Sequence, residues 1–280
     1  DNSQGFTIWG NWGPFAAANY NMGWHSKGGH DRTFGTNAKA WDWCSVNNAG
    51  FEYYQNAKKD GIGLPPHNPR IWVFRHQSNA SCAPMLRRVW HPIGYSSNSG
   101  WSNFFINITA GRLLTYTNTL LKFALPDIVI GTGGGYNTYD IYESVNHELS
   151  HASHFNKVGS AFWAKYVNYI ITYGKKYDHP YGDASCNNSG FCGVGEMWGY
   201  AMGYIRTYEK YQQKPKNGQS KWFQPNLLYD LMTEKILTKK QIFDCLSSDV
   251  TSHALLKQKM ISRYPSKKDS IIAKFSRYGF

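Results

Sequence analysis

The amino-acid sequence predicts an α+β fold in which short strands come first and helices follow. Runs of β-branched and aromatic residues of strand length occur before residue 131, and amphipathic stretches with helical spacing occur after residue 138. The 280 residues can bury a substantial core, and we expect one domain with two lobes, residues 1–137 and 138–280. The mean hydropathy is −0.53 and no apolar run approaches the roughly 20 residues that span a bilayer, so we expect no transmembrane segment.

The first lobe is predicted to combine irregular structure, two helices and a few strands. Residues 1–37 are rich in Gly, Asn and Trp without a sustained period, which indicates irregular structure with one short strand. The stretch 38–58 has apolar residues at helical spacing, and 101–125 predicts a second helix that ends before a proline. Content of β-branched, aromatic and apolar residues predicts three later strands, at 70–75, 82–90 and 127–131.

A glycine-rich loop at residues 132–135 follows the last of these strands. The loop lacks the Gly-Lys-Ser/Thr ending of a Walker motif, and its spacing is not that of a dinucleotide-binding fingerprint. We therefore interpret it as a connector rather than a phosphate-binding loop.

Residues 139–156 predict an amphipathic helix and form the most informative segment of the chain. Thr138 is suited to cap this helix, and Asp140 is favourable in its first turn. The helix carries the pentapeptide His-Glu-Leu-Ser-His at 147–151. Its apolar stripe consists of Ile141, Val145, Leu149 and Ala152.

This pentapeptide has the residue types and the spacing of a zinc site. His147 and His151 lie four residues apart, so their imidazoles share one helix face and can bind a single zinc ion at roughly 2.0–2.1 Å. Glu148 is placed to take a proton from a metal-bound water, whose pKa zinc lowers to about 7. The alternative is a helix with two surface histidines that bind nothing.

The motif at 147–151 resembles the active-site helix of the zincin metallopeptidases. The metzincin subclass requires Gly and His where this sequence has Phe155 and Lys157, so that subclass is excluded. The resemblance is to gluzincins with a long gap before a glutamate ligand, and it covers about residues 127–205. The sequence departs from the thermolysin pattern, in which the third-ligand helix carries Asn-Glu and a following Asp.

The resemblance implies that a later glutamate is the third zinc ligand, and Glu196 is the candidate. It lies 45 residues after His151, which leaves room for a predicted helix at 158–173. Glycines recur every four residues around Glu196 and allow another helix to approach closely, which offsets a cost of up to about 1 kcal/mol per glycine. The other later glutamates, Glu209 and Glu234, lie on predicted solvent faces. The alternative for Glu196 is a glutamate favoured only by a helix dipole.

Further side chains are candidates for supporting roles. His154 lies about 10 Å along the helix axis from the first motif histidine, so we expect it to support the site or contact substrate rather than bind the same ion. Glu143, one turn before the motif, is a candidate to orient the histidines. Enzymes of this type stabilise the oxyanion with an electrophilic side chain. Tyr200 is the first candidate for that role, followed by Tyr181 and His179.

The resemblance implies a zincin-like fold and a peptidase activity. We expect an upper lobe with a small mixed sheet and helices, an active-site helix across the cleft, and a mainly helical lower lobe. In zincins an edge strand pairs with the extended substrate, and 82–90 is the candidate edge. The expected chemistry is zinc-dependent hydrolysis of peptide bonds, with Glu148 as general base. The lower lobe would contain the predicted helices 226–236, 239–246, 252–264 and 267–277.

Cysteine usage and charge bear on compartment and partners. Spacing allows disulfides Cys44–Cys82 and Cys186–Cys192 with Cys245 left over, although connectivity stays open, and we expect an exported protein, secreted or at the cell surface. The net charge of +12 is scattered, no nucleic-acid module is recognisable, and we expect no nucleic-acid partner. The charge favours a peptide or protein substrate that is acidic or glycosylated. We expect a monomer.

Two other functions stay open on the sequence. An aromatic-rich first third predicts either core packing or a face that binds protein or glycan, and in the second case the metal site would be vestigial. The presence of Glu148 favours an active site, because a vestigial site has no chemical need of a base. The motif also fits a zinc hydrolase that cleaves a non-peptide bond. The tryptophans that could form this face are Trp9, Trp12, Trp24, Trp41 and Trp43.

Overall fold

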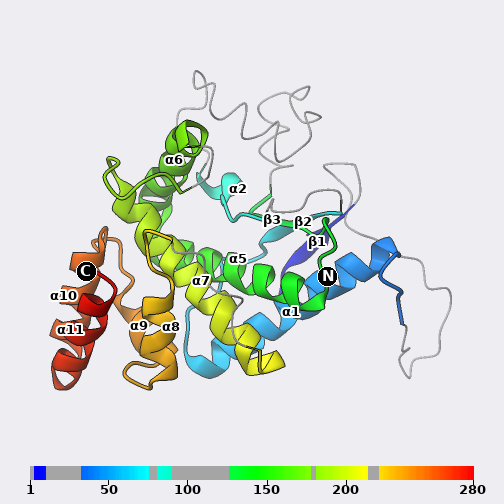
Figure 1. Ribbon diagram of the computed structural model, residues 1–280. Coiled ribbons are helices and arrows are strands. Elements are labelled where there is room, and N and C mark those ends of the chain that lie inside the picture. The colour runs from blue at the N-terminus through cyan, green and yellow to red at the C-terminus, as the bar shows by residue number, and fades with distance from the viewer. Residues whose placement is uncertain (1–2, 11–32, 76–80, 90–125, 178–180, 214–220) are drawn as a thin grey trace.

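The computed structural model has an α+β fold that is mostly helical and contains a small three-stranded parallel sheet (Figure 1). In Figure 1 the sheet lies above the long helix α5, and helices α8 to α11 gather at the lower left, away from the sheet. The predicted helix at 101–125 lies outside the described part of the chain, and the predicted boundary at residue 137 stays a prediction. The structure describes residues 3–10, 33–75, 81–89, 126–177, 181–213 and 221–280.

The sheet has the order β1-β2-β3, and its described strand pairs are both parallel. Strand β1 spans Thr7–Trp9, β2 spans Arg70–Phe74 and β3 spans Ile128–Gly131. All four residues of β3 are buried, as its apolar sequence predicts. The predicted strands at 70–75 and 127–131 are therefore confirmed. The expected mixed sheet is corrected, because the only antiparallel feature among the described residues is one isolated bridge.

That bridge joins Cys82 to Val129, and the strand predicted from Cys82 onward is wrong. The chain turns at Met85, where φ is 52°, and continues as the short helix α2, Leu86–Val89. Both arginines of α2 contact the buried carboxylate of Asp127, at 2.8 and 3.1 Å, and the Met85 N–H donates to the Asp127 carbonyl at 3.0 Å. These contacts hold the segment across the start of β3, so it does not offer the extended edge that the sequence suggested.

Helices α1 and α5 pack against each other and confirm two predicted helices. Helix α1 spans Lys39–Asp60 and α5 spans Thr138–Val158. The N-cap of α5 is Asn137 rather than Thr138, because Asn137 has the extended backbone that a cap requires. Its side chain accepts from two N–H groups, at 2.8 and 3.1 Å, and Asp140 bonds back to the Asn137 N–H at 3.1 Å.

Helices α6 and α7 follow α5 in the chain and pack against it and against each other. Helix α6 spans Ser160–Tyr177 and begins after Gly159, whose φ of 83° ends α5. Helix α7 spans Ser189–Tyr211 and packs along α5 (Figure 1). The predicted helix at 158–173 is thus confirmed with a start two residues later.

The C-terminal part of the chain is helical, as predicted. A 3₁₀ turn, Pro265–Lys267, precedes the last helix. None of the described helices combines the length and apolar character that crossing a bilayer requires. The four helices are α8 Asn226–Thr233, α9 Lys239–Cys245, α10 His253–Arg263 and α11 Lys268–Arg277.

All five cysteines lie in the described part of the chain, and none of them forms a disulfide there. The disulfides Cys44–Cys82 and Cys186–Cys192 are therefore not formed in this structure. Cys192 is fully buried in the core on α7, and burial raises the pKa of its thiol well above the usual value. The expectation of an exported protein consequently stays a prediction without a disulfide to support it.

Candidate metal centre

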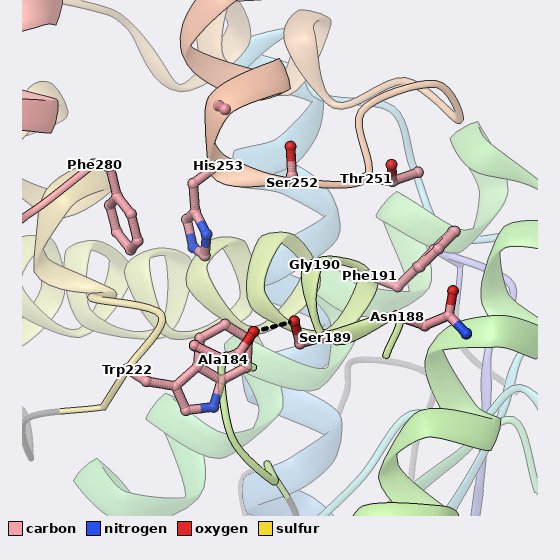
Figure 2. Close-up of a pocket in the computed structure, with 11 residues that line it drawn as sticks. Ala184, Asn188, Ser189, Gly190, Phe191, Trp222, Thr251, Ser252, His253 and Phe280 are labelled. Atoms are coloured by element: carbon pink, nitrogen blue, oxygen red, sulfur yellow. Dashed lines mark hydrogen bonds between the residues drawn. The ribbon is translucent and has the colours of Figure 1, made fainter. Parts of the chain in front are cut away.

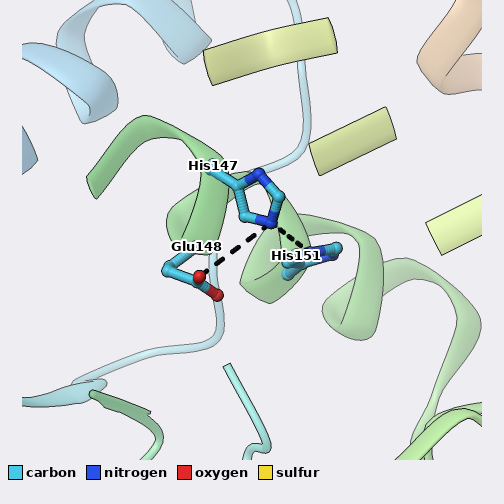
Figure 3. A group of neighbouring side chains, drawn as sticks. All are labelled: His147, Glu148 and His151. Atoms are coloured by element: carbon cyan, nitrogen blue, oxygen red, sulfur yellow. Dashed lines mark hydrogen bonds and ion pairs between the residues drawn. The ribbon is translucent and has the colours of Figure 1, made fainter. Parts of the chain in front are cut away.

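Helix α5 presents His147, Glu148 and His151 together in the interior (Figure 3). One ligand atom of each residue lies within 4.8 Å of the others. The two imidazoles meet through their Nε2 atoms at 2.9 Å, and Glu148 Oε1 lies 3.9 Å from Nε2 of His147. The i, i+4 spacing on one helix face produces this convergence, as the sequence predicted. The three side chains are buried, with 9%, 4% and 2% of their residue surface exposed.

Glu196 approaches the two imidazoles from α7. Its Oε2 atom lies 3.6 Å from Nε2 of His147 and 3.7 Å from Nε2 of His151. In a tetrahedral zinc site with bonds near 2.0–2.1 Å, the ligand atoms lie about 3.3 Å apart. The three distances between these donor atoms therefore fit one such ion to within a few tenths of an ångström.

Close packing of α7 on α5 depends on a glycine beside the imidazoles. A methyl group on Gly199 would lie 2.6 Å from Nε2 of His151 and 3.1 Å from Nε2 of His147. One turn further along, a methyl group on Gly203 would lie 3.2 Å from the Glu143 carbonyl oxygen. The glycine repeat thus brings the two helices together and keeps the space beside the Nε2 atoms free of a side chain.

Charge in this cluster is unbalanced among the described residues. Burial, followed by the neighbouring His151, lowers the pKa of His147 to about 4, so this ring is neutral at pH 7. Burial tends to raise the pKa of Glu196, but the two imidazoles outweigh it and hold the pKa below its usual value. Oε2 of Glu148 and Oε2 of Glu196 are both buried without a hydrogen-bond partner in the described chain. Two imidazole nitrogens beside buried, unpartnered carboxylate oxygens are a donor set that suits a divalent cation.

Tyr166 on α6 fixes the orientation of the Glu196 carboxylate through a hydrogen bond. Its hydroxyl donates to Oε1 of Glu196, which leaves Oε2 facing the histidines. The Tyr166 ring also packs against the ring of His151, with 5.8 Å between centroids. The sequence analysis missed this residue, because nothing in its spacing distinguishes it among 20 tyrosines.

Tyr200 and Tyr181 lie together beside His147. The ring of Tyr200 meets that of His147 edge-on, with 4.4 Å between centroids, and its hydroxyl hydrogen-bonds to the Tyr181 hydroxyl at 2.6 Å. Burial raises the pKa of both phenols well above the usual value, so both are neutral hydrogen-bond donors at pH 7. The ammonium of Lys221 covers both rings, at 4.4 and 4.8 Å from their centroids. His179, the third candidate, lies outside the described residues.

His154 and Glu143 are placed differently from the central cluster. His154 is fully buried against the rings of Phe162 and Trp163, and neither of its nitrogens has a hydrogen-bond partner in the described chain. Burial lowers its pKa to about 3. The orienting role of Glu143 stays a prediction.

Comparison with known proteins adds no relative: no protein-family model matches the chain, and searches of curated proteins and of solved structures give no match.

The aromatic first third is described in part, since Trp12 and Trp24 lie outside the described residues. Trp9 is half-buried under the guanidinium of Arg70, and Trp41 and Trp43 pack against the core. The described tryptophans of this third therefore contribute to packing.

Proposed function

We propose that the protein is a zinc-dependent metallopeptidase with a zincin-like fold and a gluzincin-type ligand set. One observation carries the proposal. Oε2 of Glu196 reaches both motif imidazoles, at 3.6 and 3.7 Å, although it comes from another helix 45 residues along the chain. A surface pair of histidines would need neither burial nor a carboxylate at this position.

His147, His151 and Glu196 would hold the Zn²⁺ ion. A bound zinc ion supplies Lewis acidity, which polarises a carbonyl group and acidifies water. Tyr166 fixes the Glu196 carboxylate through its hydrogen bond to Oε1, and Gly199 keeps side-chain atoms away from the two Nε2 atoms. Each of these contacts restricts the ligands before any ion binds, which lowers the cost of assembling the centre.

Glu148 would act as the general base and then as the general acid. Burial, followed by repulsion from Glu196, raises the pKa of its carboxyl group, which makes it a better proton acceptor than a solvated carboxylate. Its Oε2 has no partner in the described chain and can hold the proton taken from the attacking water. The same carboxyl group then delivers the proton to the leaving amine. A phenol donor, Tyr200 with Tyr181 beside it, would stabilise the oxyanion.

The substrate class follows from this chemistry and from charge. Hydrolysis with a carboxylate base suits peptide bonds of a peptide or protein, and the net charge of +12 favours targets that are acidic or glycosylated. An exported, monomeric enzyme is part of the same proposal.

Metal content and peptide hydrolysis together test the proposal. We expect about one zinc per chain in the wild type and a large loss in His147→Ala, because two ligands hold zinc far more weakly than three. Glu148→Gln should keep the zinc and lose hydrolysis by about 10²–10⁴-fold. His67→Ala, which alters an exposed histidine away from the motif, is the matched control and should change neither value. Equal zinc in the wild type and His147→Ala, or undiminished cleavage by Glu148→Gln, would overturn the assignment.

A further inference from the structure

The half-buried side chain of Lys221 lies beside the proposed metal centre. Its ammonium is 4.4 Å from the ring centroid of Tyr181 and 4.8 Å from that of Tyr200. The Tyr200 ring in turn meets the His147 ring, with 4.4 Å between centroids, so one aromatic ring separates the ammonium from a proposed zinc ligand. Burial and then His151 lower the pKa of His147, and the charge of Lys221 lowers it further.

The two residues that follow Lys221 hold it in this position. The indole N–H of Trp222 donates to the Tyr181 carbonyl at 3.0 Å, and its ring lines a pocket between the starts of α7 and α10 (Figure 2). Phe223 is fully buried, and its ring centroid lies 5.3 Å from that of Tyr181 and 5.8 Å from that of Tyr200. The backbone that carries the ammonium is therefore anchored before any ligand binds.

Lys221 differs from other covered lysines in having no acidic partner within the described chain. Lys239 and Lys274 each contact two carboxylates. The contacts of the Lys221 ammonium with described residues are those with aromatic rings, and it donates no hydrogen bond to any of these residues. Aromatic faces stabilise a cation, but they leave the three N–H donors of an ammonium without an acceptor. A bound anion would supply that acceptor.

The position of Lys221 indicates which part of a substrate meets it. In the proposed mechanism the scissile carbonyl group lies between the metal ligands and the phenols of Tyr200 and Tyr181, and the ammonium lies on those phenols. An extended peptide advances about 3.3–3.6 Å per residue. A group one or two residues from the scissile bond therefore reaches the ammonium. Carboxylates are the common anionic groups of peptides, and an ammonium binds them through charge-assisted hydrogen bonds.

We propose, on the basis of the proposed peptidase function, that Lys221 determines specificity by binding a carboxylate of the substrate within two residues of the scissile bond. The carboxylate belongs either to an Asp or Glu side chain or to the C-terminus of the substrate. The ammonium donates to it, and the rings of Tyr181 and Tyr200 keep the lysine side chain in place.

Cleavage of two random-sequence peptide mixtures, with products identified by mass spectrometry, tests the proposal and distinguishes the two sources. Both mixtures are acetylated at the N-terminus, and one is amidated at the C-terminus while the other has a free carboxylate. A side-chain source predicts cleavage within two residues of Asp or Glu, and a terminal source predicts cleavage within two residues of the free C-terminus. Either preference should be at least about tenfold over the matched Asn, Gln or amidated peptides. Cleavage without either preference would overturn the proposal and leave the peptidase function standing.

Substitution of Lys221 separates substrate binding from a packing role. Lys221→Met keeps an aliphatic chain over the rings but removes the charge. It should lower kcat/KM for the carboxylate-bearing peptides at least about tenfold and leave their uncharged counterparts nearly unchanged, and Lys221→Arg should retain the preference. Lys267→Met, at an exposed lysine in the 3₁₀ turn, is the matched control. An equal loss for charged and uncharged peptides in Lys221→Met would show a packing role and refute the proposal.

Binding to an inactive variant measures the same contact without turnover. Calorimetric titration of zinc-loaded Glu148→Gln uses the fastest-cleaved carboxylate peptide and its uncharged counterpart. We expect the carboxylate peptide to bind about tenfold more tightly, and the difference should vanish when Lys221→Met is added. Equal affinities in Glu148→Gln would overturn the proposal. A wild type that binds no zinc and cleaves neither mixture would instead overturn the peptidase function, and the role of Lys221 with it.

Discussion

The hydroxyl of Tyr166 determines which oxygen of Glu196 faces the histidines. It occupies Oε1, and Oε2 is left 3.6 and 3.7 Å from the two imidazoles. A freely rotating carboxylate would present either oxygen and would lose rotational entropy on binding a cation. Tyr166 is therefore a positioning residue whose effect is measurable without any turnover.

We predict that Tyr166→Phe lowers zinc affinity by about 10–100-fold, the usual range for loss of a hydrogen bond to a metal ligand. Competition with a chelator of known affinity measures the change. Tyr169→Phe is the matched control on the same helix, since that hydroxyl bonds to the carbonyls of Tyr181 and Asp183 and not to Glu196. Equal zinc affinities of the two variants would show that the bond to Glu196 does not position the ligand.

At the scale of residues, the sequence predicted what spacing determines. The helical repeat predicts that His147, Glu148 and His151 share one face, whereas Glu196 is a candidate through the resemblance to gluzincins, supported by its glycine neighbours and its distance along the chain. Tyr166 is not predicted, because its contact with Glu196 arises where α6 packs against α7 and no local pattern encodes that packing.

Helix α5 owes its start to Asn137, whose side chain accepts two N–H groups of the first turn. We predict that Asn137→Ala lowers the free energy of unfolding by about 1 kcal/mol, because these two donors lose their acceptor. Thr138→Ala is the control, since Thr138 is the first helical residue rather than the cap. Urea unfolding of both variants measures the difference, and an equal or larger loss in Thr138→Ala would return the cap to the residue that the sequence suggested.

The contact of α7 with α5 gives a second prediction at the scale of elements. Gly199→Ala should lower zinc affinity at least about tenfold, because its methyl group lies 2.6 Å from Nε2 of His151 and must displace the ring. Gly203→Ala makes the same change on the same face, but its nearest neighbour is the Glu143 carbonyl oxygen at 3.2 Å. It should keep most of the zinc affinity. A wild-type affinity in Gly199→Ala would show that the ring moves without cost.

Among the described residues the predicted helices are confirmed, and element prediction failed where tertiary contacts override local preference. The stretch from Cys82 onward has the composition of a strand, yet the buried carboxylate of Asp127 draws the two arginines of α2 across the start of β3. A charge pair between segments some 40 residues apart cannot be read from local composition.

At the scale of the whole molecule, one hydrophobic cluster extends from Phe6 near the N-terminus to Phe275 in the last helix. The C-terminal helices are therefore part of the same core as the sheet, and a buried histidine in α10 can affect the stability of the entire fold. His253 is such a group, because burial lowers its pKa from 6.5 to about 4.

The sign of the pH effect follows from this pKa. The unfolded chain takes up a proton at His253 near pH 6.5 and the folded protein only near pH 4, so stability is full above pH 6.5 and is lost as the pH falls toward 4. We predict that the free energy of unfolding falls less in His253→Phe than in the wild type over this interval. The difference between the two proteins should be on the order of 3 kcal/mol at most. Urea unfolding between pH 6.5 and pH 4 measures it. Parallel curves for the two proteins would show that His253 does not contribute to acid unfolding.

The packing contact between α5 and α7 has a consequence for the rate of metal release. In the proposed centre, two ligands belong to α5 and the third to α7, and the helices meet beside the metal without a side chain between them. Such an ion is released completely only when Glu196 separates from the two histidines, because its ligands belong to both helices. At high chelator concentration the rate of metal removal would therefore level off, and the plateau would equal the rate at which α7 separates from α5.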